Sequence, residues 1–220
     1  MEKLNWDSNF FNLEVFKANY YSGIENDLNG NFDLLYLYSD KLIDKSGFKQ
    51  TIQLVDKKVT FKKDIVKNKI INSETIYSVN SVNEKLFSLA IQSSEFSRFR
   101  IDNKIDNKKV DELYQLWIEN SINRKIAFDV LSFGSENYGV ITLSKKNDIA
   151  GIGLLAVDTA IRGKGIGKLL IKQTENICVE KGYKELQVVT QLDNNLACKF
   201  YESQNFLIDK IEYIYHLWNK

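Results

Sequence analysis

The sequence predicts an α/β fold with a mixed sheet, in which a smaller N-terminal α/β region precedes a larger domain. Residues 151–157 form an apolar run of strand length, followed by a loop with alternate glycines and then by apolar residues at helical spacing. From residue 93 onward, strand-like and helix-like patterns alternate, as in sheets with crossover helices. The 220 residues, 44% of them hydrophobic, suffice for a sizeable core. We expect residues 1–92 to form the smaller region and residues 93–220 the larger domain.

Charge and cysteine content argue against several classes of function. The formal net charge is +1, so no global field favours nucleic acid or an anionic membrane. The sequence shows no signal peptide and no long apolar run, and we expect a cytoplasmic protein with no nucleic-acid or membrane partner. Cys178 and Cys198 fall in predicted helices, without a CxxC pattern or clustered histidines. We therefore expect no metal site and no disulfide, as in a reducing compartment.

The N-terminal region is predicted from short strand and turn signals. Aromatic and aliphatic side chains at 32–38 are typical of a strand, and Ser39 and Asp40 can cap a helix. In order, we expect a strand at 32–38, a short helix at 41–45, one or two strands at 51–62 with a turn at 56–58, and an edge strand at 75–79.

The first part of the larger domain is predicted as a strand, helices and a strand pair. Residues 96–102 alternate between apolar and polar side chains, which indicates a strand. Asp106 or Asn107 begins a helix whose apolar face comprises Val110, Leu113, Tyr114, Trp117 and Ile118. A second short helix is expected at 120–126, followed by antiparallel strands at 130–133 and 139–144.

The remainder continues the alternation of helices and strands. A helix begins at about Gly165 and ends at Lys181, with Gly182 as its C′ residue. A strand at 185–192 follows. Asp193, Asn194 or Asn195 then caps a helix that runs to about Gln204, Asn205 adopts the left-handed conformation, and residues 206–218 form one or two β segments.

The glycine loop after the strand at 151–157 is the candidate phosphate site. A helix N-terminus presents unpaired N–H groups and about half a positive charge, and glycines let the backbone approach an anion closely. Arg162, Lys164 and Lys168 add positive charge. The loop matches neither the Walker pattern nor the dinucleotide fingerprint, because Arg162 and Lys168 stand where those patterns need glycine. A glycine-rich turn with incidental lysines is the alternative.

The segment Arg162-Gly163-Lys164-Gly165-Ile166-Gly167, placed between strand and helix, resembles the pyrophosphate loop of the GCN5-related N-acetyltransferases. The resemblance implies that this loop and Lys168 hold the pyrophosphate of acetyl-CoA, the co-substrate. It also implies that the parallel strands at 151–157 and 185–192 splay apart. The pantetheine arm then lies in the gap and bonds to the backbone of Leu155, Ala156 and Val157.

Residues 194–206 resemble a second pattern of that family, Asn-x-x-Ala-x-x-x-Tyr-x-x-x-Gly-Phe, with Asn205 in place of the glycine. The resemblance implies that Asn194 contacts the cofactor arm and that Tyr201 lies near the thioester sulfur. When an amine attacks the thioester directly, a thiolate with a pKa of about 8.5 must leave. A phenol with a pKa of about 10 can donate to that sulfur as charge builds, so Tyr201 is the candidate general acid. A core tyrosine on an amphipathic helix is the alternative.

Short segments along the whole chain resemble the bacterial dTDP-fucosamine acetyltransferases, enzymes of surface-polysaccharide pathways. They are residues 6–11, 97–100, 116–121, 152–157, 189–191 and 215–218. The resemblance implies an N-acetyltransferase that acts on the 4-amino group of dTDP-4-amino-4,6-dideoxygalactose, a sugar-nucleotide amine. It also implies a homodimer. We expect residues 1–92 to wall the acceptor site.

Candidate acceptor contacts come from the residues themselves. Arg98 and Arg100 alternate on the predicted strand and so point to one face, where guanidinium forks suit a diphosphate. A solvated or salt-bridged face is equally compatible. Asn120 is a candidate contact to the sugar, with a cap or surface role as the alternative. The lone histidine, His216, falls in the final strand pattern and is interpreted as structural.

Two matters stay open at the level of sequence. No general base stands out, and the amine proton could pass to water, to Glu119 or to Glu202. The acceptor could also be another amine, such as a different amino-sugar nucleotide, a polyamine or a protein N-terminus. A rival of another class is a non-catalytic acyl-CoA-binding module. The loop at 162–167 permits it, and the retention of Tyr201 argues against it.

Overall fold

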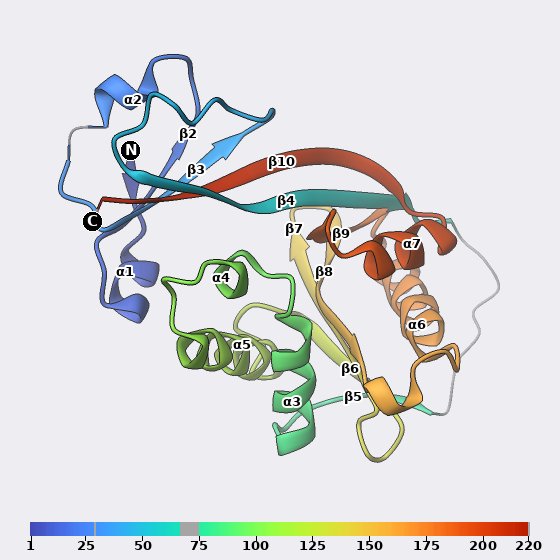
Figure 1. The fold of residues 1–220 in the computed structure, drawn as a ribbon. Coiled ribbons are helices and arrows are strands. Elements are labelled where there is room, and N and C mark those ends of the chain that lie inside the picture. The colour runs from blue at the N-terminus through green and yellow to red at the C-terminus, as the bar shows by residue number, and fades with distance from the viewer. Residues whose placement is uncertain (29, 67–74, 220) are drawn as a thin grey trace.

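The computed structural model describes residues 1–28, 30–66 and 75–219. Within these residues, ten strands form one mixed sheet in the order β1-β2-β3-β10-β4-β9-β8-β7-β6-β5. Helices pack against this sheet, which confirms the predicted α/β class (Figure 1).

The N-terminal part differs from its prediction in two places. Residues 51–64 form one long strand, without a turn at 56–58, because they pair along their length with β10. Residues 41–45 are not helical; the Ser39 hydroxyl instead donates to the Lys41 carbonyl (2.7 Å). The elements are β1 (Glu2–Lys3), α1 (Asn5–Phe11), β2 (Val15–Asn19), α2 (Ile24–Asp27), β3 (Leu34–Ser39) and β4 (Thr51–Asp64).

The segment that leads into the larger domain is more helical than predicted. The strand expected at 96–102 is wrong: a helical turn forms there, and the Ser97 hydroxyl caps it by accepting from the Arg100 N–H (3.2 Å). The separate helix expected at 120–126 is also wrong, since one helix capped by Asp106 continues to Ile122. The elements are β5 (Ile76–Ser78), α3 (Glu84–Ser93), α4 (Arg98–Ile101) and α5 (Asn107–Ile122).

The elements from residue 129 onward confirm the predicted order. Gly182 adopts a positive φ of 78° after α6, and Asn205 one of 62° after α7, as expected for residues that end helices. The elements are β6 (Asp129–Phe133), β7 (Gly139–Lys146), β8 (Ile149–Val157), the 3₁₀ turn η1 (Thr159–Ile161), α6 (Ile166–Glu180), β9 (Glu185–Gln191), α7 (Asn195–Ser203) and β10 (Leu207–Trp218).

One strand of the N-terminal part lies inside the sheet of the larger domain. β4 pairs antiparallel with β9 on one side and with β10 on the other, and β10 also pairs with β3. Figure 1 shows β4 and β10 as long neighbours that connect the two parts of the chain. The division at residue 92 stays a prediction, but the strands on both sides of it share one sheet.

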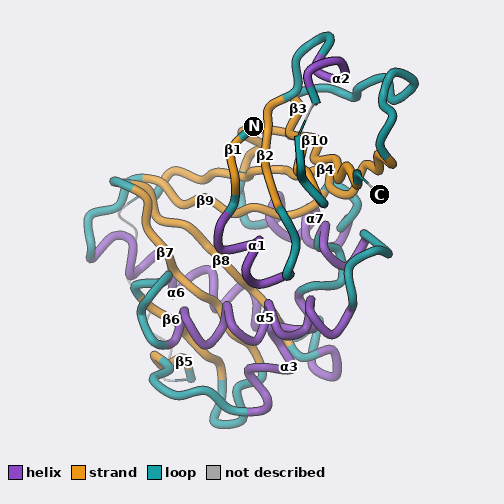
Figure 2. Tube along the Cα trace, turned by 90° about the vertical axis from the view of Figure 1, so that its left-hand side faces the viewer, coloured by secondary structure: helices purple, strands orange, loops and turns teal. Residues whose placement is uncertain are grey.

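The sheet separates two layers of helices. Side chains of α3 and α5 pack with Val130, Val140 and Leu154 in one core cluster. On the other face, α6 packs with Leu131 and Ile141, as alternate residues of a strand point to opposite faces. Figure 2 shows α3 and α5 lying together across the strands. A third cluster lies beneath β3 and the end of β10.

Candidate active site

A β-bulge in β8 opens the sheet. Leu143 of β7 pairs with Ile152 and Thr142 pairs with Leu154, which leaves Gly153 as an extra residue in β8. A bulge bends its strand and increases the local twist. Ile152 is also the last residue of β8 that pairs with β9, opposite Val188. The two parallel strands therefore separate at the bulge, which confirms the predicted splay.

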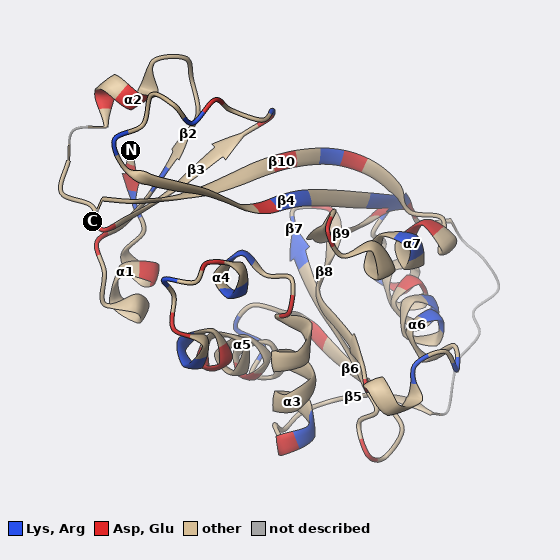
Figure 3. Cartoon of the chain, viewed as in Figure 1, with Lys and Arg blue, Asp and Glu red and all other residues tan. Residues whose placement is uncertain are grey.

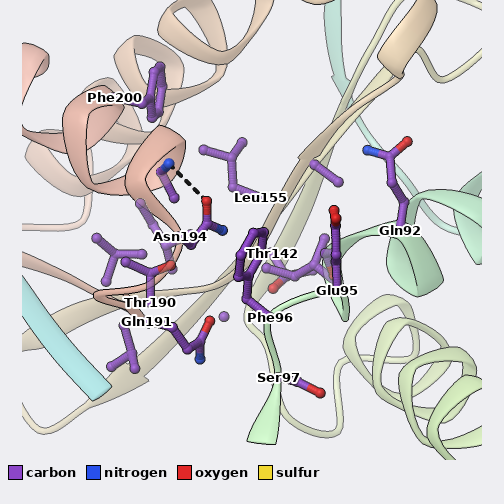
Figure 4. Close-up of a pocket in the computed structure, with 18 of the residues that line it drawn as sticks. Gln92, Glu95, Phe96, Ser97, Thr142, Leu155, Thr190, Gln191, Asn194 and Phe200 are labelled. Carbon is purple, nitrogen blue, oxygen red and sulfur yellow. Dashed lines mark hydrogen bonds between the residues drawn. The ribbon is translucent and has the colours of Figure 1, made fainter. Parts of the chain in front are cut away.

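The separation opens into a cleft of about 1020 Å³. One side is formed by residues 153–157 of β8, residues 188–191 of β9, the glycine loop and α7. The other side is formed by the end of α3, α4, one face of α5 and β4. In Figure 4, Asn194 and Phe200 lie on one side of the cleft, and Gln92 and Glu95 lie on the other.

The glycine loop forms the entrance to α6. Gly163 and Gly165 have φ values of 80° and 79°, which glycine adopts readily. Gly165 is the N-cap of α6 and offers no side chain, so the first N–H groups of this helix have no side-chain cap. These N–H groups can bind an anion. Figure 3 shows Lys and Arg residues in and beside this loop.

Most of the predicted loop residues line the cleft. Arg162, Gly163, Gly165, Ile166, Gly167 and Lys168 do so, together with Leu155, Ala156 and Val157 of β8. Lys164 is exposed and is not among the lining residues. The Arg162 side chain turns back to donate from Nε to the Val157 carbonyl (3.1 Å), which also accepts from Gln92 Nε2 (3.0 Å). The backbone at Val157 is thus held from both sides of the cleft.

Asn194 and Tyr201 lie in α7 and its cap. The Asn194 Oδ1 accepts from the Ala197 N–H (3.1 Å), so this side chain caps the helix at the edge of the cleft. Tyr201 is 6% exposed and lines the cleft. Its ring contacts Phe61, Phe200 and Phe206, with centroids 5.4 to 5.8 Å apart. Burial raises the pKa of the phenol, which keeps it protonated at neutral pH.

The structure separates the three predicted acceptor residues. Arg98 lines the cleft, with its guanidinium carbon 4.4 Å from the Tyr36 ring centroid and 4.7 Å from that of Phe99. Arg100 instead points to α5, where it forms an ion pair with Asp111. Neither Arg100 nor Asn120 is among the lining residues. The predicted common face is wrong, because a helical turn places alternate residues on different sides.

Asp56 is a cleft residue that the sequence patterns missed. It lies in β4 opposite Ile214 of β10 and is 7% exposed. Burial raises the pKa of its carboxyl to about 6, although Arg98, Gln191 and Lys58 lower it. Its sequence neighbours Lys57 and Lys58 suggested a polar turn, and nothing local indicated that a distant strand covers it.

His216 occupies the core beside this region. It is 0% exposed, and its Nδ1 lies 2.6 Å from Asp102 Oδ2, which also accepts from Trp218 Nε1 (2.9 Å). Burial lowers the pKa of His216 to about 4, although Asp102 raises it. The ring is therefore neutral at pH 7 and donates from Nδ1. It stacks on Tyr36 at 4.8 Å, which is consistent with the structural interpretation.

A sequence model of the acetyltransferase (GNAT) family matches residues 91–206. This match covers more than half of the chain. The chain belongs to the GNAT family of acetyltransferases. The predicted enzyme class is thereby confirmed at the level of the family.

Two relatives of this GNAT chain match parts of it. The spore coat polysaccharide biosynthesis protein SpsD of Bacillus subtilis is 26% identical over 136 residues, which are 61% of this chain and 47% of SpsD. N-alpha-acetyltransferase 30 of Xenopus laevis is 39% identical over 66 residues, 30% of this chain and 24% of that protein. The chain thus spans about half or less of the length of these relatives.

Solved structures support the fold. A GNAT-family acetyltransferase from Colwellia psychrerythraea superposes with a TM-score of 0.50 at 15% identity, over 90% of this chain and 69% of the other. A functionally unknown conserved protein from Staphylococcus epidermidis gives 0.57 at 10% identity, over 86% and 74%. At these identities the likeness concerns the fold alone.

Among residues 1–28, 30–66 and 75–219, no group of three or more His, Cys, Asp or Glu side chains is arranged to hold a metal ion. In the same ranges, no helix has both the length and the apolar character needed to cross a bilayer.

Proposed function

We propose that this chain transfers acetyl from acetyl-CoA to the 4-amino group of a dTDP-4-amino-4,6-dideoxyhexose, in the cytoplasm, during surface-polysaccharide biosynthesis. The observation that carries the proposal is one cleft that joins an open gap in the sheet to a second wall with charged residues, among them Asp56, Glu95 and Arg98. The gap lies between β8 and β9 and ends at the unpaired N-terminus of α6. The proposal also includes the division of the chain at residue 92. It further includes a homodimer, which the resemblance implies.

In this proposal the acetyl-CoA occupies the β8 side of the cleft. The pyrophosphate binds the loop at 162–168, where free N–H groups, Arg162 and Lys168 meet. The pantetheine arm runs along residues 155–157, whose edge toward β9 has no strand partner beyond Ile152. Asn194 caps α7 through Oδ1, which leaves its Nδ2 for the arm.

The proposed reaction is direct attack by the amine. The amine nitrogen forms a bond to the thioester carbonyl carbon, the C–S bond breaks, and the sulfur leaves as a thiolate that takes up a proton. Tyr201 is the proposed donor at the sulfur. Because burial raises its pKa, the phenol is protonated throughout the working range, and it stabilises the developing charge by donating a hydrogen bond.

The proposed acceptor occupies the wall formed by α3, α4, α5 and β4. Arg98 is the proposed contact for the diphosphate, since it lines the cleft and its guanidinium packs against two aromatic rings. The roles assigned to Arg100 and Asn120 remain predictions without support from the lining of the cleft. The likeness to SpsD, a spore coat polysaccharide biosynthesis protein, supports an acceptor from this class.

The test is turnover with a panel of acceptors. Purified protein is mixed with acetyl-CoA and dTDP-4-amino-4,6-dideoxygalactose, its 4-epimer or the 3-amino isomer, and free thiol release is followed. We expect release with the 4-amino-galactose sugar and not with the 3-amino isomer. Release with another panel member would keep the reaction and change the acceptor. Acetyl-CoA binding by calorimetry without release from any amine would instead indicate a non-catalytic binding module.

A peptide N-terminus is the second candidate acceptor. It is favoured by the 39% identity to N-alpha-acetyltransferase 30, although only over 66 residues. The panel therefore includes short peptides with free N-termini. Faster thiol release with a peptide than with any sugar nucleotide would select this candidate.

A further inference from the structure

We propose that Asp56 is the carboxylate that takes the proton from the acceptor amine. This inference rests on the proposed N-acetyltransferase function and adds to it the base that the sequence did not reveal. Asp56 lies on β4, the N-terminal strand inserted between β9 and β10. It lines the same cleft as Tyr201 and the open stretch of β8.

The local backbone directs Asp56 to the cleft. β4 pairs with β9 only as far as Lys58, opposite Gln191, so Asp56 lies just beyond the last paired residue. On its other side, the pairing with β10 shifts register between Ile214 and Tyr215, which leaves Val55 without an opposite residue. Such a bulge re-aims side chains. The carboxyl thus comes to lie where β9 has already separated from β8.

The carboxyl is buried but not neutralised. Asp56 is 7% exposed, and its Oδ1 has no hydrogen-bond partner among the residues that the structure describes. Within the same residues it also takes part in no ion pair. A buried carboxylate oxygen without a partner is costly. A protonated amine in the cleft would supply the missing donor, and transfer of that proton leaves the nitrogen free to attack.

The surrounding charges suit a base that works near neutral pH. Arg98 of α4 and Lys58 of β4 favour the ionised form, Asp193 after β9 opposes it, and Tyr114 of α5 also faces the carboxyl. Burial outweighs the two cations and raises the pKa of Asp56 to about 6. The group is ionised at pH 7 and still basic enough to accept a proton.

The proposed route of the proton from Asp56 to the surface passes through a second cavity. A second cavity of about 180 Å³ adjoins the first, and Asp56 and Gln191 line both. This cavity is also lined by Lys57 and by the exposed Asp193, which form an ion pair of 2.9 Å. The proton received from the amine therefore has ionisable groups on its way to solvent. Overall, the protonated amine and acetyl-CoA give amide, free thiol and one proton released to water, and the second proton lost by the nitrogen after attack replaces the one that Tyr201 gives to the sulfur.

The kinetic test compares Asp56→Asn, Asp56→Glu and Glu95→Gln over pH 5 to 10 with the panel amines. Glu95 is the competing carboxylate, since it also lines the cleft but is exposed. We expect kcat to fall by about 10²-fold or more in Asp56→Asn. In the plot of kcat against pH, the rise near pH 6 should be lost, while the rate should still increase at alkaline pH. Asp56→Glu should recover part of the rate. Loss of that limb in Glu95→Gln but not in Asp56→Asn would overturn the proposal.

A second measurement does not depend on finding the acceptor. The carboxyl carbons of ¹³C-labelled protein are titrated by NMR, and the Asp56 signal is assigned by its absence in Asp56→Asn. We expect a midpoint near pH 6. A midpoint below about pH 4 is that of an ordinary carboxyl and would rule out Asp56 as the base. A cooperative thermal unfolding transition and an unchanged acetyl-CoA affinity would show that Asp56→Asn is folded. If no panel amine reacts, the proposed function fails while the titration still decides on Asp56.

Discussion

Thr142 Oγ1 lies in the space that a side chain on Gly153 would need. A Cβ added to Gly153 would come within 2.9 Å of this oxygen. Gly153 is also the bulged residue of β8, at the point where β8 and β9 separate. The contact thus connects the packing of one glycine with the shape of the whole cleft.

The first prediction concerns this contact. Gly153→Ala forces Thr142 or the bulge to move, and because a β-branched side chain is stiff at χ1, part of the strain falls on the backbone. We expect a loss of about 1–3 kcal/mol in the free energy of unfolding and weaker acetyl-CoA binding. In the double variant with Thr142→Ala, part of the stability and part of the acetyl-CoA binding should be restored. Stability is measured by denaturation and acetyl-CoA binding by calorimetry. If the single and double variants lose equal amounts of both, the steric explanation is excluded.

The second prediction concerns a glycine of the loop. At this position a side chain has room, but the backbone has a positive φ, which alanine rarely adopts. A Cβ at Gly165 meets nothing within 4 Å, but its φ is +79°, and Gly182 at the far end of α6 has φ +78° and equal space. Alanine at either position should cost about 1 kcal/mol or more of stability. Only Gly165→Ala should raise the dissociation constant for acetyl-CoA. Equal binding losses in Gly182→Ala would argue against the loop as the phosphate site.

Tyr201→Phe removes one hydroxyl and keeps the ring among Phe61, Phe200 and Phe206. We expect kcat to fall by about 10²-fold or more, with little change in acetyl-CoA affinity, because the lost interaction forms only as the sulfur leaves. Tyr183→Phe is the matched control, since Tyr183 stacks on Phe128 and does not line the cleft. An unchanged kcat in Tyr201→Phe would remove this residue from the reaction.

Much of the site was predictable because its residues are contiguous. The loop at 162–167 and the cap at Asn194 combine turn chemistry with helix patterns that local sequence determines. The helical turn at 98–101 was not predictable in this way, because the placement of Phe96, Arg98 and Arg100 at alternate positions fits a strand equally well. The burial of Phe99 and the Ser97 cap decide for a helix. Asp56 was missed for another reason: its partners lie on β10, far along the chain, and no local pattern reports such pairing.

Arg98 provides a test of the acceptor side. Lysine keeps the charge but cannot reproduce the planar contacts with Tyr36 and Phe99 or a forked contact to phosphate. Arg98→Lys should raise the KM for the sugar nucleotide by about tenfold and leave that for acetyl-CoA nearly unchanged. Arg100→Lys is the control, because Arg100 does not line the cleft and forms its ion pair with Asp111. Steady-state kinetics that show equal shifts for both substrates would contradict the diphosphate contact.

His216 and Asp56 should give the stability opposite dependences on pH. The pKa of His216 is about 4 in the folded state and about 6.5 unfolded. Between these values the unfolded state binds more protons, so its contribution to stability is complete above pH 6.5 and is lost as pH falls. Asp56, with a folded pKa of about 6 and an unfolded value near 3.9, contributes stability that is lost as pH rises through 4 to 6.

Two variants separate these contributions by denaturation between pH 4 and 7. In His216→Gln the free energy of unfolding should decline as pH rises. In Asp56→Asn it should rise with pH more steeply than in the unmodified protein. Parallel curves for all three proteins would show that neither group titrates in this window.

The position of β4 between β9 and β10 also sets the order in which the chain can fold. β4 is complete at Asp64, but both of its neighbours follow residue 184. During synthesis this strand leaves the ribosome with both edges unpaired and must wait for β9 and β10. Contacts of such sequence separation slow folding and leave strand edges open to other molecules. The strand that carries Asp56 is thus made early and is enclosed only after β10 has been made.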